Sequence, residues 1–403
     1  MRTTANYAES VGSEELLTIE DATVVCFSHL RWDFVYQRPQ HLLSRLARHH
    51  DVLFIEEPVF EDVAEPTMRV GAREGRIRVG VPVLPHGLSE SGKILAQRQL
   101  VDQQLASLPP APRILWYYTP MALLFSRHLD ADVVVFDNMD QLSAFKGAPP
   151  ELVALEDEML ARAHVVFTGG HSLYEAKKHR HDNIHAFPSS IDVAHFGRGR
   201  AHDRKEPDDQ AAIPGPRIGF FGVVDERMDL DLVRELADTR PNWSFVMIGP
   251  VVKIDPADLP RRSNIHWLGG RDYKTLPEYI GGWDVGFMPF AMNESTQFIS
   301  PTKTPEFLAA GVPVVSTPIV DVVRSYGDEK HVVIAKGAAA FVEAAEELMA
   351  MERANWLQRV DQKLAESSWD QTFERIYEHV AAAARRSGAD HEGAHLRKDT
   401  FRV

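Results

Sequence analysis

Short apolar runs rich in Val, Ile and Phe alternate with amphipathic stretches along most of the chain, and this alternation restricts the possible folds most. The runs are nearly continuous in apolar residues, which is typical of strands buried on both faces of a parallel sheet. Strands that alternate with helices predict an α/β fold. The expected strands are residues 23–28, 52–56, 77–81, 114–118, 133–137, 165–168 and 184–187, followed by 217–221, 244–248, 265–268, 285–288, 314–316 and 332–334.

The length of the chain predicts two domains, because 403 residues exceed the size at which a single hydrophobic core keeps growing. We expect two Rossmann-like doubly wound domains, residues 1–200 and 217–368, facing each other across a cleft. The charged, proline-containing segment 201–216 is the predicted linker. Residues 369–386 are expected to form a further helix, and the polar tail 387–403 is expected to be mobile.

Composition narrows the classes of function. The net charge of -14 argues against a general nucleic-acid binder, which needs a basic surface. The single cysteine, Cys26, lies in an apolar run and is expected to be a buried thiol, which suits a reducing cytoplasm.

Localisation is predicted to be cytoplasmic. Residues 1–21 lack the apolar region of a signal peptide, and no run reaches the length needed to span a bilayer. The basic amphipathic stretch 39–50 leaves peripheral membrane contact open, although a helix that packs on the core explains it as well.

The segment Ser300–Thr317 joins a lysine, a short helix with an early acid, and a buried strand. Thr304 is the predicted N-cap, and Gly311 is expected to end the helix. In this arrangement Lys303 can reach an anion near the start of the helix, and Glu306 can accept hydrogen bonds from a sugar diol. The alternative is that Glu306 only complements the helix dipole while Lys303 is solvated.

Three loops of the second half follow predicted strands, where ligands of parallel sheets bind. Gly222 permits close backbone approach to a diphosphate, and Arg227 can add a charge-assisted bond. Backbone groups near Gly270 can read the edge of a nucleobase. The polar loop 289–299, which contains Glu294, is of the kind that holds a sugar. An ordinary connection remains the alternative for each loop.

The first half offers a long aromatic loop at 28–41 and two carboxylates after a strand. Arg38 is expected near a helix N-terminus, which the dipole disfavours, and this placement indicates a nearby anion. Asp137 and Asp140 can orient an acceptor hydroxyl, act as a base or hold a metal, or they can simply form an Asx turn or a helix cap.

No metal site is predicted. The histidines at 179, 181 and 185 lie among basic residues, and a solvated turn explains them better than a metal site does. Asp137 and Asp140 have no evident third ligand.

The segment 301–315 resembles the P-x-K-x-x-E-[FY]-x-A-x-G-x-P-V-V block of GT-B glycosyltransferases of the retaining family 4, or group 1, type. Residues 221–227, 267–273 and 283–290 are similar to supporting elements of that family in order and spacing. In the first half, residues 27–32, 36–41 and 136–140 resemble bacterial polysaccharide-assembly members, including teichuronic-acid-type transferases. The resemblance covers about residues 20–385.

The resemblance implies transfer of a sugar from a UDP- or GDP-linked donor to a glycan, a lipid-linked or a small-molecule acceptor, with retention of configuration. Glu306 would bind the ribose, and Lys303 and Arg227 would stabilise the departing diphosphate. The first domain would bind the acceptor and the second the nucleotide sugar, and a helix beginning near Trp369 would cross back to the first domain. The donor residues would be Gly222, Gly270, Arg271, Tyr273, Lys303 and Glu306.

The remaining candidates come from the loops. Phe298 stands where the family usually has a second glutamate, and Glu294 is out of register, so the contacts to the donor sugar do not carry over. The two-glycine turn of many members is replaced by residues 29–32, so no acceptor contact is implied. The candidate catalytic residues are Arg227, Lys303, Asp137 and His29, and those for the acceptor or sugar are Arg38, Asp140, Glu294 and Ser300.

Two other classes of function stay open. A non-hydrolysing nucleotide-sugar epimerase has the same fold and needs acid and base groups on both faces of the sugar, for which Asp137 and His29 are the candidates. A non-catalytic partner subunit is the other alternative, and the presence of Arg227, Lys303 and Glu306 argues against it. The sequence gives no indication of oligomeric state.

Overall fold

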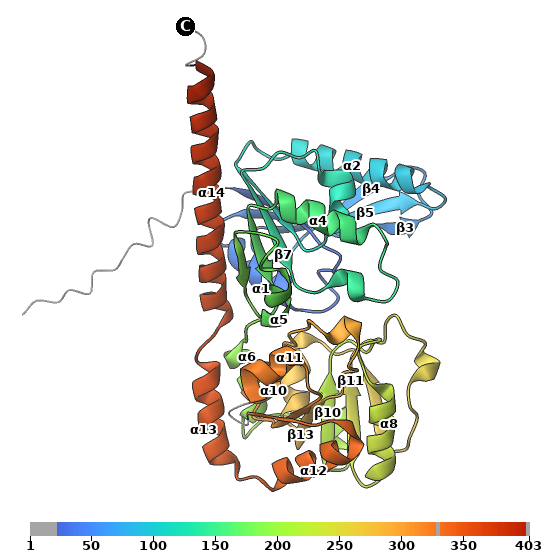
Figure 1. Cartoon of the computed structure of the whole chain (residues 1–403). Coiled ribbons are helices and arrows are strands. Elements are labelled where there is room, and N and C mark those ends of the chain that lie inside the picture. The colour runs from blue at the N-terminus through green and yellow to red at the C-terminus, as the bar shows by residue number, and fades with distance from the viewer. Residues whose placement is uncertain (1–21, 328–330, 400–403) are drawn as a thin grey trace, which may run out of the picture.

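The computed structural model describes residues 22–327 and 331–399, with side chains up to residue 387. Two sheets form the centres of two domains, which lie one beyond the other along the molecule (Figure 1). The first sheet has the order β3-β5-β2-β1-β6-β7-β8-β9 with β4 paired to β5, and the second has the order β12-β11-β10-β13-β14-β15. Except for β4, which is antiparallel to β5, the paired strands are parallel. The predicted α/β class with two doubly wound sheets is confirmed.

The strands of the first sheet are β1 (Thr23–Phe27), β2 (Asp51–Ile55), β3 (Val59–Glu61), β4 (Thr67–Ala72), β5 (Ile77–Pro85), β6 (Arg113–Tyr117), β7 (Val133–Asn138), β8 (Val165–Thr168) and β9 (Ile184–Ala186). Those of the second are β10 (Arg217–Phe221), β11 (Ser244–Ile248), β12 (Ile265–Gly269), β13 (Val285–Met288), β14 (Val314–Ser316) and β15 (Val332–Ile334).

The α-helices of the first half are α1 (Arg38–Leu46), α2 (Glu90–Ala106), α3 (Leu123–Ser126), α4 (Leu152–Arg162), α5 (His171–Lys177) and α6 (Val193–Gly197). Those that follow are α7 (Asp208–Ala211), α8 (Leu230–Thr239), α9 (Leu276–Ile280), α10 (Lys303–Ala309), α11 (Val320–Val322), α12 (Gly337–Ala350), α13 (Arg353–Leu364) and α14 (Trp369–Asp399).

Both faces of each sheet are covered, which is why the strands are apolar throughout. In β1, Val24 and Cys26 pack in the cluster shared with α1 and α14, whereas Val25 and Phe27 face the cluster that includes α2, α3 and α4. In the second sheet, one face packs against α10 and α13 and the other against α8 and α12. Cys26 is a buried free thiol, as predicted.

Two strands of the first domain, β3 and β4, were not expected from the sequence. The residues of β4 are half-buried or exposed, and the strand includes Arg69 and Gly71. It lies outside the main path of the sheet and pairs only with β5. Because β4 buries little side-chain surface, its sequence lacks the apolar run from which a strand can be predicted.

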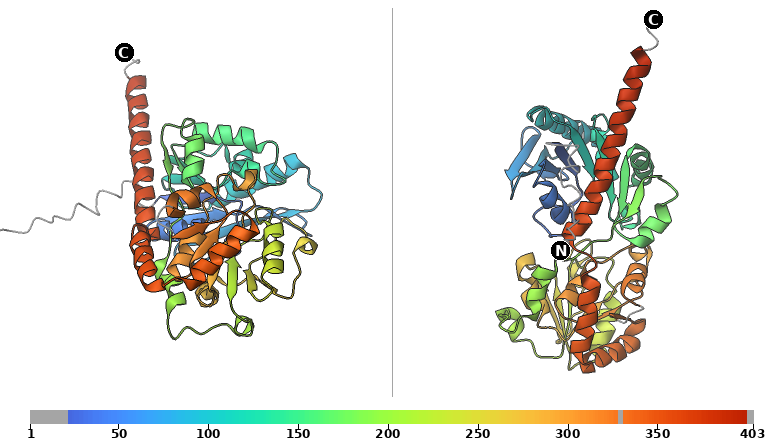
Figure 2. Two further views of the ribbon diagram at one scale, coloured as in Figure 1. Left: turned by 60° about the horizontal axis from the view of Figure 1, so that its bottom comes forward. Right: turned by 90° about the vertical axis from the view of Figure 1, so that its left-hand side faces the viewer.

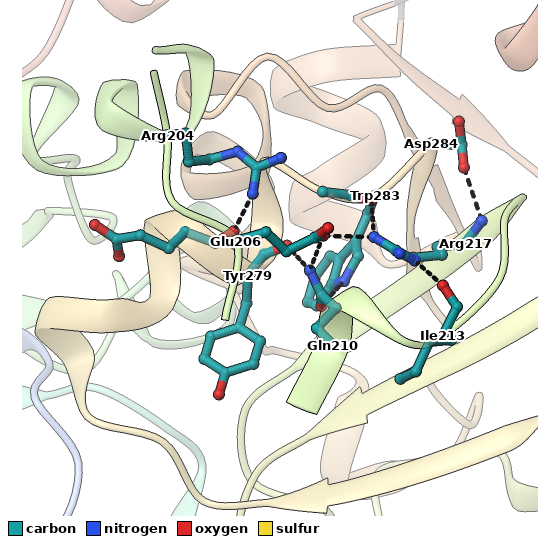
Figure 3. Close-up of polar contacts among 10 residues, drawn as sticks. Arg204, Glu206, Gln210, Ile213, Arg217, Tyr279, Trp283 and Asp284 are labelled. Carbon is teal, nitrogen blue, oxygen red and sulfur yellow. Dashed lines mark hydrogen bonds and ion pairs between the residues drawn. The ribbon is translucent and has the colours of Figure 1, made fainter. Parts of the chain in front are cut away.

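The predicted linker, residues 201–216, packs on the second domain, and Figure 3 shows its polar contacts. Gln210 is fully buried; its amide nitrogen donates to the Tyr279 carbonyl at 2.9 Å, and its amide oxygen accepts from the Trp283 indole at 2.8 Å. Arg217 binds Glu206 at 2.5 Å. The charges of this segment therefore form specific contacts within one domain. Phe187 packs in a core cluster of the first domain and Ile191 in one of the second, so the chain first passes between the domains at residues 187–191.

The helix α14 lies along the first domain and extends beyond it (Figure 2). Its first residue, Trp369, stacks on His41 of α1 with ring centroids 4.3 Å apart, and Tyr377 hydrogen bonds to His50 at 2.8 Å. The helix continues to Asp399, beyond the predicted end at residue 386. Residues 387–399 have little amphipathic pattern but contain good helix formers such as Ala, Glu, Leu and Lys. Residues 400–403 of the predicted tail lie outside the described residues.

Candidate functional site

A cavity of about 860 Å³ lies between the two domains, where loops from the carboxyl ends of both sheets meet. This volume is in the range of small-molecule sites. The second domain contributes the loops after β10, β11, β12 and β13 together with the start of α10. The first domain contributes the loop after β1, Glu74 of the β4–β5 turn, and the loops after β7 and β8. The sequence-predicted residues that line this cavity are Asp140, Gly222, Arg227, Gly270, Arg271, Tyr273, Ser300, Lys303 and Glu306.

Lys303 is the first residue of α10, and Gly222 makes room for it. Gly222 has a φ of +127°, and a Cβ at this position would lie 2.1 Å from Cε of Lys303. The ammonium lies 5.8 Å and 6.0 Å from the ring centroids of Phe220 and Phe290. Burial lowers the pKa of Lys303, and the charge of Arg227 adds to this effect. An anionic ligand in the cavity would favour the charged form of Lys303 and so raise its pKa again.

The start of α10 differs slightly from the prediction. The N-cap is Thr302, so Thr304 is inside the helix, where it is buried and its hydroxyl contacts the sulfur of Met288 at 3.3 Å. Gly311 follows the helix with a φ of +78°, as expected for a glycine that ends it.

Arg227 is held in place by Asp225. Its Nε lies 3.0 Å and 3.1 Å from the two carboxylate oxygens, and one terminal nitrogen lies 2.6 Å from Oδ2. The guanidinium also lies 5.3 Å from the ring centroid of Phe145, which belongs to the first domain. These contacts fix a cation at the cavity wall next to Lys303.

Glu306 lies one turn after Lys303 on α10, and residues three apart share one side of a helix. Burial raises the pKa of Glu306, and the positive charge of Lys303 opposes this shift. A partly desolvated carboxylate at this position gains from accepting hydrogen bonds, as a sugar diol would donate.

Tyr273 lines the cavity but cannot stack on a nucleobase, because both faces of its ring are covered. His195 stacks on it at 4.3 Å and Tyr36 at 4.7 Å between centroids. Its hydroxyl is buried and makes no hydrogen bond to the described residues. A contact to a ligand would therefore come from the hydroxyl.

The loop after β12 places Gly270 and Arg271 at the cavity. Arg271 donates to the Tyr279 hydroxyl at 2.9 Å and binds Asp209 at 2.5 Å. Gly270 has its nearest heavy atom 4.0 Å from a built Cβ, so its backbone is open to a ligand.

Asp140 and Ser300 also reach the cavity. Burial raises the pKa of Asp140, and Arg227 opposes this shift. The loop that carries Asp140 needs Gly169, where a Cβ would lie 2.3 Å from the Met139 carbonyl oxygen. Ser300 packs against Gly170, where a Cβ would lie 2.8 Å from the Ser300 Cβ.

The predicted roles of Arg38 and Asp137 at the site are corrected by the structure. Both side chains are buried, with exposed fractions of 1% and 0%, and neither lines the cavity. Nε of Arg38 lies 3.0 Å from both oxygens of Asp137, and another nitrogen donates to the Phe187 carbonyl at 2.6 Å. The anion indicated by Arg38 is therefore the protein's own carboxylate, and the pair joins α1 to the end of β7.

His29 and Glu294 also lie outside the residues that line the cavity. Burial lowers the pKa of His29 to about 4, and Lys253 adds to the shift. Glu294 is exposed at the start of a 3₁₀ turn. The epimerase alternative thus loses both of its acid–base candidates, Asp137 and His29.

Sequence reasoning did not single out several residues of the cavity wall. Phe34 and Tyr36 come from the aromatic loop after β1, and their side chains are 55% and 41% exposed. The aromatic composition of that loop was the only feature of the sequence that could have indicated a ligand-binding role for these two residues. Glu74 follows β4, and because β4 was missed the turn was missed too.

The part of the chain that the structure describes has neither a cluster suited to a metal ion nor a helix suited to span a membrane. No group of three or more His, Cys, Asp or Glu residues there is placed to hold a metal ion. No helix there has the length and apolar character required to cross a membrane.

Comparison with solved structures identifies the class of this fold. The catalytic domain of starch synthase IV from Arabidopsis thaliana, bound to ADP and acarbose, superposes with a TM-score of 0.64 at 10% identity, over 91% of this chain and all of that one. Anabaena Alr3699/HepE in complex with UDP and glucose gives 0.63 at 13% identity, over 88% and 98%. The sucrose-phosphate synthase of Thermosynechococcus elongatus gives 0.61 at 12% identity, over 93% and 100%. The chain has the GT-B fold.

Sequence comparison gives the family. Residues 215–351, which include Gly222, Arg227, Lys303 and Glu306, match the family model described as Glycosyl transferases group 1, so the second domain belongs to the group 1 glycosyltransferases. The chain is also 26% identical over 222 residues to a Bacillus subtilis protein assigned to teichuronic acid biosynthesis as the glycosyltransferase TuaH. That alignment spans 50% of this chain and 55% of the relative, so the match covers about half of each protein.

Proposed function

We propose that this protein transfers a sugar from a nucleoside-diphosphate donor to a hydroxyl of an acceptor, with retention of configuration. One observation carries the proposal: Lys303, Arg227 and Glu306 face one interdomain cavity and lie within the segment matched by the group 1 family. Two fixed cations suit a diphosphate, and the carboxylate suits a ribose.

The chemistry follows from these charges. The bond between the anomeric carbon and the diphosphate oxygen breaks, and negative charge develops on the leaving group. Lys303 and Arg227 are already in place to stabilise this charge in a partly desolvated cavity. The acceptor oxygen forms the new glycosidic bond on the same face of the sugar, and its proton passes to the departing phosphate. No protein nucleophile takes part in this scheme.

The donor is proposed to be a UDP- or GDP-linked sugar. UDP appears with Anabaena Alr3699/HepE and UDP-2-fluoro glucose with an E. coli structure of the same fold. The acceptor is proposed to be a glycan, a lipid-linked glycan or a small molecule, with a place in polysaccharide assembly suggested by TuaH. A cytoplasmic location, with possible peripheral membrane contact, remains a prediction from the sequence.

Thermal unfolding with UDP, GDP, ADP, TDP and their sugars tests the donor site. A nucleotide at 100 times its dissociation constant adds about 2.7 kcal/mol of stability. We expect one base to stabilise the wild type selectively, with the shift lost in Lys303→Ala and Glu306→Ala and kept in Lys363→Ala, which changes a lysine outside the cavity on α13. No shift with any nucleotide would overturn the proposal.

Incubation with the donor but no acceptor separates the two enzyme classes. A transferase leaves the configuration of the nucleotide sugar unchanged, whereas an epimerase converts it. Conversion without acceptor would favour the epimerase and would require acid–base groups other than His29 and Asp137.

A further inference from the structure

We propose that the first-domain wall of the cavity binds the acceptor as an uncharged sugar ring, stacked on Phe34 and hydrogen bonded at its edge by Glu74, and that it discriminates against sugar phosphates. This inference rests on the proposed function, because it assigns the second substrate of the same cavity. The observations that carry it are the separation of charge between the two walls and one unstacked aromatic ring.

Charge is divided between the two walls by domain. Every lysine and arginine that lines the cavity belongs to the second domain: Arg227, Arg271, Lys274 and Lys303. The charged lining residues of the first domain are the carboxylates Asp33, Glu74 and Asp140. A phosphate monoester carries nearly two negative charges at neutral pH, so the first-domain wall would repel it.

The nearby arginines of the first domain leave the Glu74 carboxylate of this wall unpaired. Arg38 is paired with buried Asp137, and Arg31 is bound to Glu56 at 3.0 Å. Arg73 binds Asp33 through two contacts of 3.1 Å and 2.5 Å, which neutralise Asp33 and attach the turn before β5 to the aromatic loop. Glu74, the next residue, is exposed and forms no ion pair with the described residues, so its carboxylate is free to accept hydroxyl donors.

Phe34 is the aromatic ring of this wall that is left without a ring partner among the described residues. Tyr36 is stacked on Tyr273, and Trp32 packs edge-on against Phe54 at 5.1 Å. Phe34 has no such ring partner among the described residues and is 55% exposed while lining the cavity. A pyranose presents C–H groups on its face and hydroxyls around its edge, so an aromatic ring and a free carboxylate on the same cavity wall match it.

The test uses pairs of probes that differ only in charge. Saturation-transfer NMR with saturating UDP or GDP, whichever stabilises the protein, would compare the methyl glycosides of glucose, galactose, mannose and N-acetylglucosamine with their 6-phosphates. At least one uncharged ring should bind about tenfold tighter than its 6-phosphate. Tighter binding of a 6-phosphate, or no binding of any uncharged ring, would overturn the proposal.

Two variants identify the residues involved, each with a matched control. Phe34→Ala should weaken the binding of the uncharged probe about tenfold. Phe60→Ala should not, because Phe60 is an exposed residue of β3 outside the cavity. Glu74→Lys should reduce the discrimination against the 6-phosphate, whereas Glu65→Lys, exposed and outside the cavity, should leave it unchanged. Unchanged behaviour of Phe34→Ala and Glu74→Lys would contradict the assignment.

The rise in unfolding temperature with nucleotide distinguishes failure of this inference from failure of the proposed function. If UDP or GDP stabilises the protein but no uncharged probe binds more tightly than its 6-phosphate, only the acceptor assignment is wrong. If no nucleotide stabilises the protein, the donor site itself is wrong. Both variants should keep the nucleotide shift, which also shows that they are folded.

Discussion

Gly222 shows how much one residue controls at this site. The position next to Lys303 has no space for a Cβ, which would lie 2.1 Å from Cε and 2.7 Å from Nζ of the lysine. We expect Gly222→Ala to displace the lysine and weaken nucleotide binding about 10- to 100-fold, the value of a hydrogen bond to a charged group. Calorimetric titration with the stabilising nucleotide would measure this.

The control for backbone strain is Gly87→Ala. Gly87 has a φ of +83° and no heavy atom within 4 Å of a built Cβ, so the substitution imposes left-handed strain without a contact. It should lower stability while keeping nucleotide affinity. Equal affinity losses in the two variants would mean that strain, and not Lys303, accounts for the effect.

The pair of Arg38 and Asp137 is predicted to act on stability. Both groups are buried, so Asp137→Asn leaves a buried guanidinium without its counter-ion and should cost about 3–5 kcal/mol. Urea unfolding would measure this loss. Because neither residue reaches the cavity, the nucleotide affinity of the folded variant should be unchanged. If the variant had normal stability but weakened nucleotide binding, Asp137 would be part of the binding site after all.

At the scale of elements, the contact between α1 and α14 depends on a neutral histidine. Burial lowers the pKa of His41 from 6.5 to about 3, with further lowering by Arg45 and His195, and the ring stacks on Trp369 at an interplanar angle of 9°. The folded pKa lies below the unfolded value, so the unfolded chain binds the proton first as the pH falls. The contribution to stability is therefore complete above pH 6.5 and is lost as the pH falls towards 3.

We expect His41→Phe to reduce the acid sensitivity of folding. The phenyl ring keeps the stack but binds no proton, which removes up to about 1.4 kcal/mol of unfolding free energy per pH unit below the unfolded pKa. Urea unfolding at a series of pH values would show a shallower slope than the wild type. His49→Phe, at an exposed position just after α1, is the control. An unchanged slope for His41→Phe would show that other groups govern acid unfolding.

The elements that sequence reasoning found are those that bury apolar surface. The runs at 133–137 and 285–288 occur as β7 and β13 because both faces of each strand are covered. The edge strand β4 has no such signal. The segment 201–216 has the composition of a linker, but its charged side chains bind residues that are far away in the sequence. Asp209 pairs with Arg271, and Arg204 donates to the backbone carbonyl of Glu278.

The same limit applies to the site. Lys303 and Glu306 are predictable because they lie three residues apart in a recognisable local block. Arg38 indicated a nearby anion, but its partner lies 99 positions away, and no local pattern distinguishes a protein carboxylate from a ligand. Phe34 and Glu74 become meaningful only when the fold places both at one cavity.

For the whole molecule, the cavity exists because the two domains contact each other around it. Phe145 of the first domain covers Arg227, and Tyr36 stacks on Tyr273. On another side, buried Asp321 of α11 accepts a hydrogen bond at 2.8 Å from the backbone N–H of Ser172 in α5. This bond lies beside Ser300 at the cavity wall, since both Asp321 and Ser300 pack against Gly170. Separation of the domains would thus break the Asp321 contact and open the donor site together.

We expect Asp321→Ala to favour an open arrangement of the domains. A hydrogen bond to a charged acceptor is worth about 1.5–3 kcal/mol, so its loss should weaken nucleotide binding about tenfold or more if binding requires the closed arrangement. Small-angle X-ray scattering should show a larger radius of gyration without nucleotide, and saturating nucleotide should restore the wild-type value. Asp231→Ala, on α8 outside the cavity, should change neither quantity. If Asp321→Ala kept the wild-type dimensions and affinity, the contact with α5 would not hold the domains together, and the stacking of Tyr36 on Tyr273 would be the next candidate.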